Sequence, residues 1–409
     1  MVFKCQENSF LKEYTSKVLS CECTTINTII KGKKTTLEGY EVILENTILF
    51  PEGGGQPSDT GYLNDSRVYH VSRKEDIAVH YVDKPLIVGE NVKQVIDWPR
   101  REDHMQQHSG QHLLSAILER EYNMQTVSWW LGEDVSYVEL DTTSLNNHLI
   151  GEIEEKANAL IREGRKVTVT VYDENISANE LSDARSTRGL PADHKGDIRV
   201  INIDGVDSNM CCGTHVTNLC QLQAIKLLSY ERSKRKDKTL LYFLCGQRVL
   251  KKLENCLEKE QKLTTLLKNN PSQHAELVDK LQKNCKILSK NLQVVLKDLA
   301  VKEAEKLKGI NPIPKYYCLH RKEADPDFMR VFIEEFNRND ILLFLSTGDE
   351  NGNFVLYGPE KDVQKLSPEI CNVLNGKGAG KGNKFQAKVT NMRCRPEAEK
   401  LIIQYYSES

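Results

Sequence analysis

The sequence predicts an α+β fold made of four consecutive segments. Residues 1–98 carry β-branched and aromatic residues between Gly, Asn and Asp breaks, a pattern typical of short strands in a β-barrel-like domain. Residues 99–245 mix helical and strand periods, and residues 246–310 change to Lys, Leu, Glu and Gln in a helical repeat. Residues 311–409 return to alternating strand and helix patterns, so we expect a small α/β domain there.

Composition and charge limit what this chain of 409 residues can be. Hydrophobic residues make up 39% and charged residues 28%, which is typical of a soluble globular protein. No stretch approaches the ~20 apolar residues that a membrane span needs. The net charge of −2 disfavours a protein that coats nucleic acid without discrimination. Twelve cysteines without a secretory signal indicate reduced thiols and a cytoplasmic location.

The β-rich segment contains a glycine-rich run. Residues 52–56 read Glu-Gly-Gly-Gly-Gln, and the sequence Asp-Thr-Gly follows at residues 59–61. Three consecutive glycines permit unusual backbone dihedrals and a close approach of the backbone to another group. A substrate-binding loop and a plain wide turn both fit this spacing, so the two alternatives stay open.

The second segment begins with a predicted helix that carries a pair of histidines. Asp97 and Pro99 mark its start, and we expect it to continue to about Tyr122. His108 and His112 are four residues apart, so both side chains lie on one face of this helix. The helix therefore offers two imidazoles to a common ion.

A second pair with the same spacing follows a predicted strand. After a helix near residues 150–165 and a strand near 167–171, a strand at 198–203 leads toward Cys211 and His215. Imidazole and thiolate suit Zn²⁺ better than Mg²⁺ or Ca²⁺, which prefer oxygen ligands. The four side chains can share an ion only if the fold brings the two pairs together. The sequence thus predicts a metal centre that depends on tertiary structure.

The third segment has the pattern of a coiled coil. Apolar residues recur at alternating intervals of three and four, and residues 269–272 break the pattern into two helices. An antiparallel helical hairpin is the simplest interpretation, and an intermolecular coiled coil is the alternative. The main seam consists of Val278, Leu281, Cys285, Leu288, Leu292, Val295 and Leu299.

The last segment predicts three strands, near residues 316–319, 341–345 and 354–357. Two helices are expected, and they fall near residues 327–336 and 363–374. A run in which Gly alternates with Lys or Ala then follows, and we expect a surface loop suited to phosphate contact. Its spacing is not that of a Walker A loop, so we infer no nucleotide binding from it.

Three local runs resemble the alanyl-tRNA editing proteins, freestanding relatives of the editing half of alanyl-tRNA synthetase, in their long eukaryotic form. The runs are residues 52–61, residues 97–101 leading into the histidine helix, and residues 211–215. The resemblance covers nearly the whole chain. It implies that His108, His112, Cys211 and His215 bind one zinc ion per chain.

Two further residues near these motifs are expected to stay outside the metal centre. Cys212 stands where the family usually has glycine, so we expect a bystander. His104 lies outside the family's paired spacing, and we expect it beside the site or on the surface. The helical segment and the tail are similar to the C-terminal part of the synthetase, which contributes to tRNA binding and self-association. The tail has more lysine and fewer glycines than that pattern.

The resemblance implies a zinc-dependent aminoacyl-tRNA deacylase that edits in trans. The expected substrate is tRNA(Ala) charged with serine, with glycine as a second candidate. The β-rich domain begins at the N-terminus, which leaves no aminoacylation domain upstream, so we expect correction without charging. Homodimerisation through the helical segment is one open alternative. The residues we expect to bind tRNA are Lys234, Arg235, Lys236, Lys377, Lys381 and Lys384.

The role of the metal and the reading of the substrate stay open. Zinc can lower the pKa of a bound water, or it can organise the site, because four protein ligands usually mark a closed structural centre. We predict that Thr47 and Gln56 read the hydroxyl or the ester of the substrate, with ordinary strand and loop hydrogen bonding as the alternative.

Three other functions compete with this interpretation. A non-enzymatic zinc protein that binds RNA would use the same ligands, closed permanently. A zinc hydrolase acting on small molecules is disfavoured, because a small substrate needs neither the basic clusters nor the C-terminal domain. Editing of serine on tRNA(Thr) would use similar motifs.

Overall fold

In the computed structural model the chain is a mixed α+β protein, as the sequence predicts. It divides into two compact units, Met1–Gln261 and Lys262–Ser409. Each unit has its own hydrophobic clusters and is described by itself. The residues that the structure describes are 3–30, 33–173, 184–185 and 197–408.

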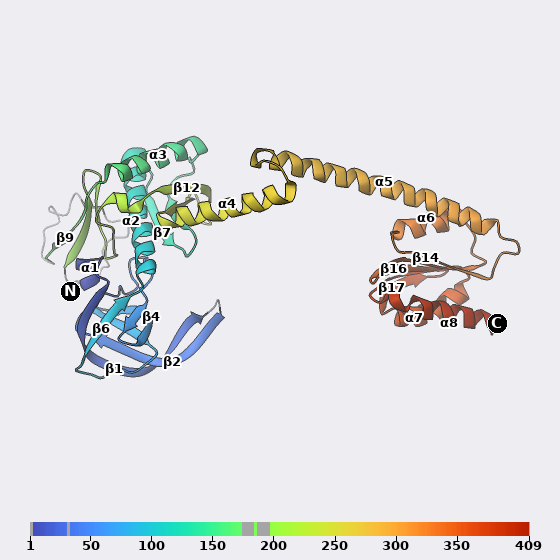
Figure 1. Ribbon diagram of the computed structural model, residues 1–409, viewed down its shortest axis with the longest axis horizontal. Helices are drawn as coiled ribbons and strands as arrows, with labels where there is room; N and C mark the ends of the chain where they lie inside the picture. Colours follow the sequence, from blue (N-terminus) through green and yellow to red (C-terminus); the bar gives the residue numbers. More distant parts are fainter. Residues whose placement is uncertain (1–2, 31–32, 174–183, 186–196, 409) are drawn as a thin grey trace. The chain divides into compact units, whose positions relative to one another are not determined.

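A closed six-stranded barrel forms the beginning of the first unit (Figure 1). Its strands follow the order β1-β2-β5-β4-β3-β6, and alternate residues such as Val42 and Val68 point inward and are fully buried. The β-rich pattern of the first segment thus corresponds to a barrel wall. The strands are β1 Glu13–Ile30, β2 Lys33–Leu44, β3 Gly61–Leu63, β4 Ser66–Lys74, β5 Ile77–Val82 and β6 Asn91–Ile96.

Helix α2 (Trp98–Tyr122) follows β6 directly and runs from the barrel toward the rest of the first unit (Figure 1). It begins after Asp97, with Pro99 in its first turn, and it ends at Asn123 in a left-handed conformation. These limits confirm the predicted helix. Every residue from His104 to Leu118 is buried, polar ones included, so α2 is a central helix with polar side chains that must find partners inside the protein.

Two antiparallel sheets complete the first unit. One has the strand order β12-β13-β8-β7, and the other β11-β10-β9. The strands predicted near residues 167–171 and 198–203 are confirmed as β9 and β10, and the predicted helix near 150–165 is confirmed as α3. The elements are β7 Thr126–Leu131, β8 Ser136–Leu140, α3 Asn147–Glu163, β9 Val167–Tyr172, β10 Ile198–Ile203, β11 Asp207–Met210, β12 Ile225–Arg232 and β13 Thr239–Cys245.

The leucine seams of the two long helices are exposed. In α4 (Gln247–Leu267), Leu253 is 54% exposed, and in α5 (His274–Lys308), Leu288 is 66% exposed. Only the C-terminal part of α5, from Leu296 onward, packs into a core. The predicted hairpin concerns both units and stays a prediction, as does the intermolecular coiled coil.

The second unit is a five-stranded sheet with helices on both faces. Leu343 and Leu345 pack with α5 and α6, whereas Leu342 and Phe344 pack with α7 and α8. This alternation follows from the period of two along a strand. The order is β14-β15-β16-β18-β17, with β14 Tyr316–Arg321, α6 Pro326–Phe336, β15 Leu342–Gly348, β16 Gly352–Tyr357, α7 Glu360–Val373, β17 Gly376–Lys381, β18 Lys384–Val389 and α8 Arg395–Ser407.

Most predicted elements of this unit are confirmed, but the glycine- and lysine-rich run is not a loop. It forms the edge strand β17, paired antiparallel with β18. Glycine disfavours strands in general, which is why the sequence predicted a loop. Here the missing side chains allow close packing, because a Cβ on Gly378 would lie 2.5 Å from the Cβ of Ala387. Tertiary contact therefore overrides the local preference.

In the part of the chain that the structure describes, no helix combines the length and apolar character needed to cross a membrane. All twelve cysteines are free thiols.

Candidate metal centre

Two distant segments of the first unit meet in one cluster of ligand atoms. Helix α2 supplies His108 and His112, and the loop after β11 supplies Cys211 and His215. The ligand atoms of these four residues all lie within 4.8 Å of one another. The three histidines are buried, and Cys211 is partly buried. The structure thus brings together the two pairs that the sequence analysis singled out.

The spacing of the ligand atoms fits a tetrahedral zinc ion. The Sγ atom of Cys211 lies 3.4 Å from Nε2 of His108 and 3.3 Å from Nε2 of His215. Bonds of roughly 2.0–2.1 Å to nitrogen and 2.3 Å to sulfur place tetrahedral ligand atoms about 3.3–3.8 Å apart. One thiolate and three imidazoles are also the soft and borderline ligands that zinc prefers. The residues present therefore fit the metal that the sequence predicted.

The loop that carries Cys211 is held by a buried arginine. Nη1 of Arg199, on β10, donates to the carbonyl oxygens of Cys211 and Gly213, each at 2.8 Å. Gly213 lies so close to the cluster that an added Cβ would be 2.2 Å from Cε1 of His108. Any larger residue at this position would displace the loop or the ring. Arg199 and glycine together fix the loop against helix α2.

Hydrogen bonds at Nδ1 of His108 and His215 leave the Nε2 atom of each ring to face the cluster. Oε1 of Gln56 lies 2.9 Å from Nδ1 of His108. An amide oxygen only accepts hydrogen bonds, so Nδ1 carries the proton and Nε2 is left to bind a metal. Nδ1 of His215 lies 3.1 Å from Oγ of Ser109, which leaves its Nε2 toward Cys211 in the same way. Such partners orient metal-binding imidazoles.

Burial keeps the imidazoles of His112 and His215 neutral. Burial is the main cause that lowers the pKa of His112 and His215 well below the usual value, and neighbouring His108 and Arg199 add to it. Neutral imidazole is the form that binds a metal ion.

The glycine-rich run lies directly against this cluster. Gly54 and Gly55 have φ angles of +58° and +84°, which favour glycine. A Cβ on Gly55 would lie 2.6 Å from the ring of Trp129, and that ring is 5.0 Å from the ring of His108. The run therefore does more than turn the chain, because it packs its backbone against residues that line the metal centre.

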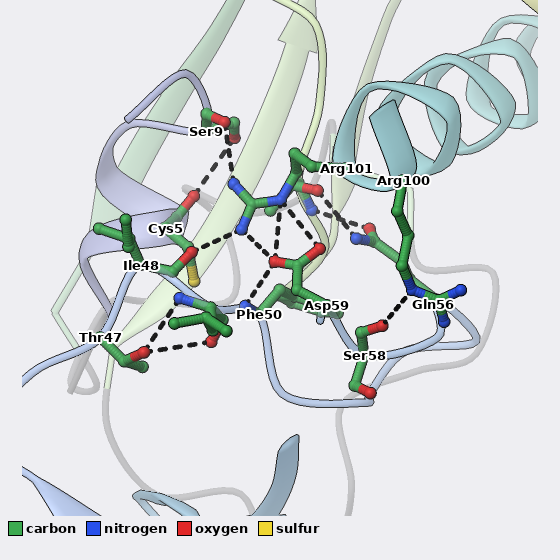
Figure 2. A network of polar contacts seen from close by, with 12 residues as sticks. Cys5, Ser9, Thr47, Ile48, Phe50, Gln56, Ser58, Asp59, Arg100 and Arg101 are labelled. Atoms are coloured by element: carbon green, nitrogen blue, oxygen red, sulfur yellow. Dashed lines mark hydrogen bonds and ion pairs between the residues drawn. The ribbon is translucent and has the colours of Figure 1, made fainter. Parts of the chain in front are cut away.

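A fully buried ion pair connects the barrel to helix α2 (Figure 2). Arg101 binds the carboxylate of Asp59, and both side chains are 0% exposed. Nη1 of Arg101 also donates to the carbonyl oxygen of Ser9 at 2.9 Å, and Nη2 donates to that of Ile48 at 2.6 Å. Asp59 in turn accepts a hydrogen bond from the backbone of Phe50 at 2.7 Å. This network fixes the start of α2 to both ends of the loop that contains the glycine-rich run.

The roles of several of these residues could not be predicted from the sequence. Asp59 and Arg101 lie within the quoted motifs, but their pairing is invisible without the fold. Arg199 and Ser109 carried no signal that distinguishes them from other polar residues. Arg101 stands among Arg100, Glu102 and Asp103, so its burial could not be predicted from the sequence.

The two predicted substrate readers lie in different surroundings. Thr47 is 1% exposed, and its hydroxyl lies 2.8 Å from Nε2 of His80 inside the barrel. Gln56 is fully buried, and its Nε2 donates to the hydroxyl of Thr214 at 2.8 Å while its oxygen faces His108. The structure places Gln56 beside the metal cluster and Thr47 outside it. Their part in reading the substrate stays a prediction.

His104 and Cys212 are not part of the four-residue cluster. His104 is buried, so the surface position expected as one alternative is wrong, and burial together with nearby arginines lowers its pKa to about 3. The carbonyl oxygen of Cys212 accepts a hydrogen bond from Gln6 at 2.8 Å.

The basic residues predicted to bind tRNA occur in both units. Lys234, Arg235 and Lys236 are exposed on the turn between β12 and β13. In the second unit, Lys377 pairs with Lys388, and Lys381 pairs with Lys384, across the β17–β18 hairpin. Residues opposite one another in an antiparallel pair share a face, so these four lysines stand on one face.

Two family models match parts of this chain. The model for the "Threonyl and Alanyl tRNA synthetase second additional domain" matches residues 198–241, and that for "tRNA synthetases class II (A)" matches residues 4–100.

Full-length relatives share the name of one family. The chain is 47% identical to alanyl-tRNA editing protein Aarsd1-B of Xenopus laevis, over 98% of this chain and 97% of that protein. It is 45% identical to alanyl-tRNA editing protein Aarsd1 of Mus musculus, over 100% of this chain and 98% of that one. The putative alanyl-tRNA editing protein alaX of Saccharomyces cerevisiae is 33% identical, over 95% of this chain and 93% of the relative. The chain therefore belongs to the family of alanyl-tRNA editing proteins.

Proposed function

We propose that this protein hydrolyses, in trans, the ester that joins serine to tRNA(Ala), and that it also accepts glycine. One observation carries the proposal beyond family membership, namely the convergence of His108, His112, Cys211 and His215 within 4.8 Å. A zinc ion held by these residues would assist ester hydrolysis if one coordination position opens to water or substrate.

The reaction corrects errors that arise because an alanine-binding pocket selects its amino acid imperfectly. A pocket built for alanine cannot exclude the smaller glycine, and it rejects an added hydroxyl by only roughly a hundredfold. A second site can favour serine over alanine by bonding the hydroxyl, because a buried polar group that alanine leaves unpaired costs about 1–3 kcal/mol. Glycine lacks the hydroxyl, so we propose that it is accepted because it is smaller than alanine. Thr47 and Gln56 are our candidates for reading the hydroxyl or ester, and each lies among buried polar groups.

The residues of this chain hold and shape the metal centre. His108, His112, Cys211 and His215 are the proposed ligands of one zinc ion, whose chemistry when bound is to polarise a carbonyl or lower the pKa of a water molecule. Gln56 holds the proton of His108 at Nδ1, so that Nε2 stays available. On this proposal Gln56 acts through His108 in addition to any contact with substrate.

Two basic surfaces are proposed to bind the tRNA. Lys234, Arg235 and Lys236 lie on a turn of the first unit. In the second unit, Gln386 pairs with Val355, whose side chain belongs to the core under α5 and α6. The lysines of β17 and β18 therefore stand on that same face of the sheet, beyond the strands that α5 and α6 cover. These lysines are Lys377, Lys381, Lys384 and Lys388.

We propose that the chain works as four parts. These are the barrel at 1–98, the zinc-binding editing domain at 99–245, a helical hairpin at 246–310 and a C-terminal domain at 311–409. The exposed leucine seams support self-association through the helical part. A cytoplasmic location suits both the tRNA substrate and twelve free thiols.

The decisive experiment measures deacylation of Ser-, Gly- and Ala-charged tRNA(Ala) in parallel, with metal content determined on the same sample. We expect serine and glycine to be released and alanine to be retained, with one zinc per chain. Metal-loaded protein that binds tRNA but releases no amino acid would support a non-enzymatic zinc protein instead. Faster hydrolysis of Ser-tRNA(Thr) than of Ser-tRNA(Ala) would reassign the tRNA.

A further inference from the structure

We propose that Trp130, Tyr137 and Tyr242 form a platform on which unpaired nucleotides of the RNA substrate stack. The inference rests on the proposed function, because it assigns a surface to the strand that enters the metal centre. It concerns residues with no role in the cluster of ligand atoms. We call these three residues the aromatic platform.

The platform is a row of rings across three neighbouring strands. Trp130 on β7 is opposite Tyr137 on β8, and Tyr137 is opposite Tyr242 on β13. Opposite residues point to the same face of an antiparallel sheet. The ring centroids are 5.8 Å apart for the first pair and 5.7 Å for the second. The planes of Trp130 and Tyr137 are tilted by 38°, and Tyr137 meets Tyr242 edge to face at 72°, so the three rings form a row whose faces point in different directions.

Trp130 faces solvent, Tyr137 and Tyr242 are half-buried, and the rings of Trp130 and Tyr242 are held in place. Trp130 is 53% exposed, whereas its neighbour Trp129 is 7% exposed and belongs to the core of the first unit. A Cβ on Gly132 would lie 2.3 Å from the Trp130 ring, so the ring rests on the backbone there. The phenol of Tyr242 donates a hydrogen bond to Glu231. Aromatic residues that gather on a solvent-facing sheet surface often mark an interaction site.

Positive charge lies at one end of the platform. The basic turn between β12 and β13 ends at Thr239, three residues before Tyr242 and thus about 10 Å away along the strand. Arg235 and Lys238 of this turn bind Glu139 and Asp141. Within the described parts of the chain, Arg232, Lys234 and Lys236 make no ion pair, so three cations stand against the carboxylate of Glu231, which Tyr242 contacts, and are available to phosphates.

Acidic residues at the opposite end give the bound strand a direction. Glu133 and Asp134 are exposed in the turn that follows Trp130. Phosphates are repelled there and attracted to Lys234 and Lys236, so the backbone enters at the basic turn. At Trp130 the contact must be made by a base.

The platform leads to the metal centre around the edge of the sheet. β7 is an edge strand, and its consecutive residues Trp129 and Trp130 point to opposite faces. The ring of Trp129 lies 5.0 Å from the ring of His108. Residues 129 and 130 of β7 thus join the metal centre on one face of the sheet to the platform on the other, and on this proposal the strand passes round this edge.

Nucleotides suit this surface better than a protein partner does. Every base has a flat π face, and stacking on an aromatic side chain contributes about 1–3 kcal/mol per base without sequence readout. A row of rings beside unpaired cations is the arrangement that single-stranded RNA modules use.

The test uses the full-length, metal-loaded chain and an uncharged, unpaired oligoribonucleotide of roughly eight residues, followed by fluorescence anisotropy. We expect Trp130→Ala and Tyr137→Ala each to weaken binding at least about fivefold, and Trp130→Phe to retain most of it. Lys234→Glu with Lys236→Glu should weaken binding and flatten its salt dependence. The same strand annealed into a duplex should bind more weakly, because its bases are not free to stack.

Tyr62→Ala is the matched control, because Tyr62 is an exposed aromatic residue, 42% exposed, on the barrel. An equal loss of affinity in Tyr62→Ala, or unchanged affinity in both alanine variants of the platform, would overturn the proposal. So would the absence of oligonucleotide binding by the unaltered chain. Deacylation is measured separately. If the unaltered chain hydrolyses Ser-tRNA(Ala) but Trp130→Ala leaves oligonucleotide binding unchanged, the platform is refuted and the proposed function stands.

Discussion

The carboxamide oxygen of Gln56 lies 2.9 Å from Nδ1 of His108, although the two residues are 52 positions apart. Gln56 comes from the glycine-rich run and His108 from helix α2, so this contact joins two of the motifs that the sequence offered separately. The other end of the carboxamide donates to Thr214, which belongs to the third motif. Gln56 is therefore the point at which all three meet.

Gln56→Ala should weaken metal binding by about 10–100-fold, because His108 loses the partner that fixes its ring and tautomer. Chelator competition on the purified protein measures the affinity. Gln56→Glu keeps an accepting oxygen beside Nδ1 and should recover much of the loss. Gln94→Ala is the control, since Gln94 is an equally buried glutamine in the barrel. Equal metal affinities in all four proteins would contradict the positioning role.

Cys211→Ala should abolish both zinc retention and deacylation, because it removes the only sulfur ligand of the cluster. Metal analysis and release of serine from Ser-tRNA(Ala) are measured on one preparation. Cys212→Ala alters the adjacent thiol and should retain the metal. A Cys211→Ala protein with full zinc stoichiometry and full activity would refute the ligand assignment.

Breaking the buried Asp59–Arg101 pair should lower the free energy of unfolding by about 3–5 kcal/mol, because either single variant leaves an unpaired buried group. Arg101→Met and Asp59→Asn are compared by urea denaturation, and the double variant should lose less than the sum of the two. Lys93→Met removes an exposed ion pair with Glu13 and should cost less than about 1 kcal/mol. Similar losses in Lys93→Met and Arg101→Met would show that the burial of the pair is irrelevant.

Acid should destabilise the barrel through His80. Burial lowers the pKa of His80 to about 4 from a usual value of 6.5, so the unfolded chain binds the proton more readily. The contribution of neutral His80 to the free energy of unfolding is complete above about pH 6.5. It is lost as the pH falls toward 4, and the loss amounts to at most about 3 kcal/mol.

Urea denaturation at pH 7.5 and at pH 5 tests this behaviour. His80→Gln can still bond with Thr47 and the carbonyl of Val42, and it should lose less stability on acidification than the unaltered chain. His148→Gln is the control, because the side chain of His148 is 85% exposed. An unchanged pH dependence in His80→Gln would show that His80 does not titrate on unfolding.

Replacing two lysines of the β17–β18 hairpin should weaken binding of tRNA and make it less sensitive to salt. Lys377→Glu with Lys388→Glu removes two facing cations, so the slope of log affinity against log salt should fall by about 2. Lys361→Glu with Lys400→Glu makes the same charge change on α7 and α8, the helices of the opposite face. If both double variants bind tRNA alike, the hairpin has no special part in binding.

The sequence was most informative where structure is local. The limits of helix α2, the strands β9 and β10 and most elements of the second unit followed from periodicity and from Asp97 and Pro99, because such signals act within a few residues. The glycine- and lysine-rich run was assigned wrongly, since its strand state depends on packing of Gly378 against Ala387.

By itself, the sequence determined which short motifs carry the chemistry of the site. It supplied two pairs of metal ligands at helical spacing, a glycine-rich run, basic clusters and a family resemblance that full-length relatives confirm. Only the tertiary structure decided which of these motifs lie in contact with one another. Cys211 and His108 are 103 positions apart, and their 3.4 Å approach depends on the barrel, on Arg199 and on the buried Asp59–Arg101 pair. Contacts between distant segments arise from packing of the whole domain, and no local pattern encodes them.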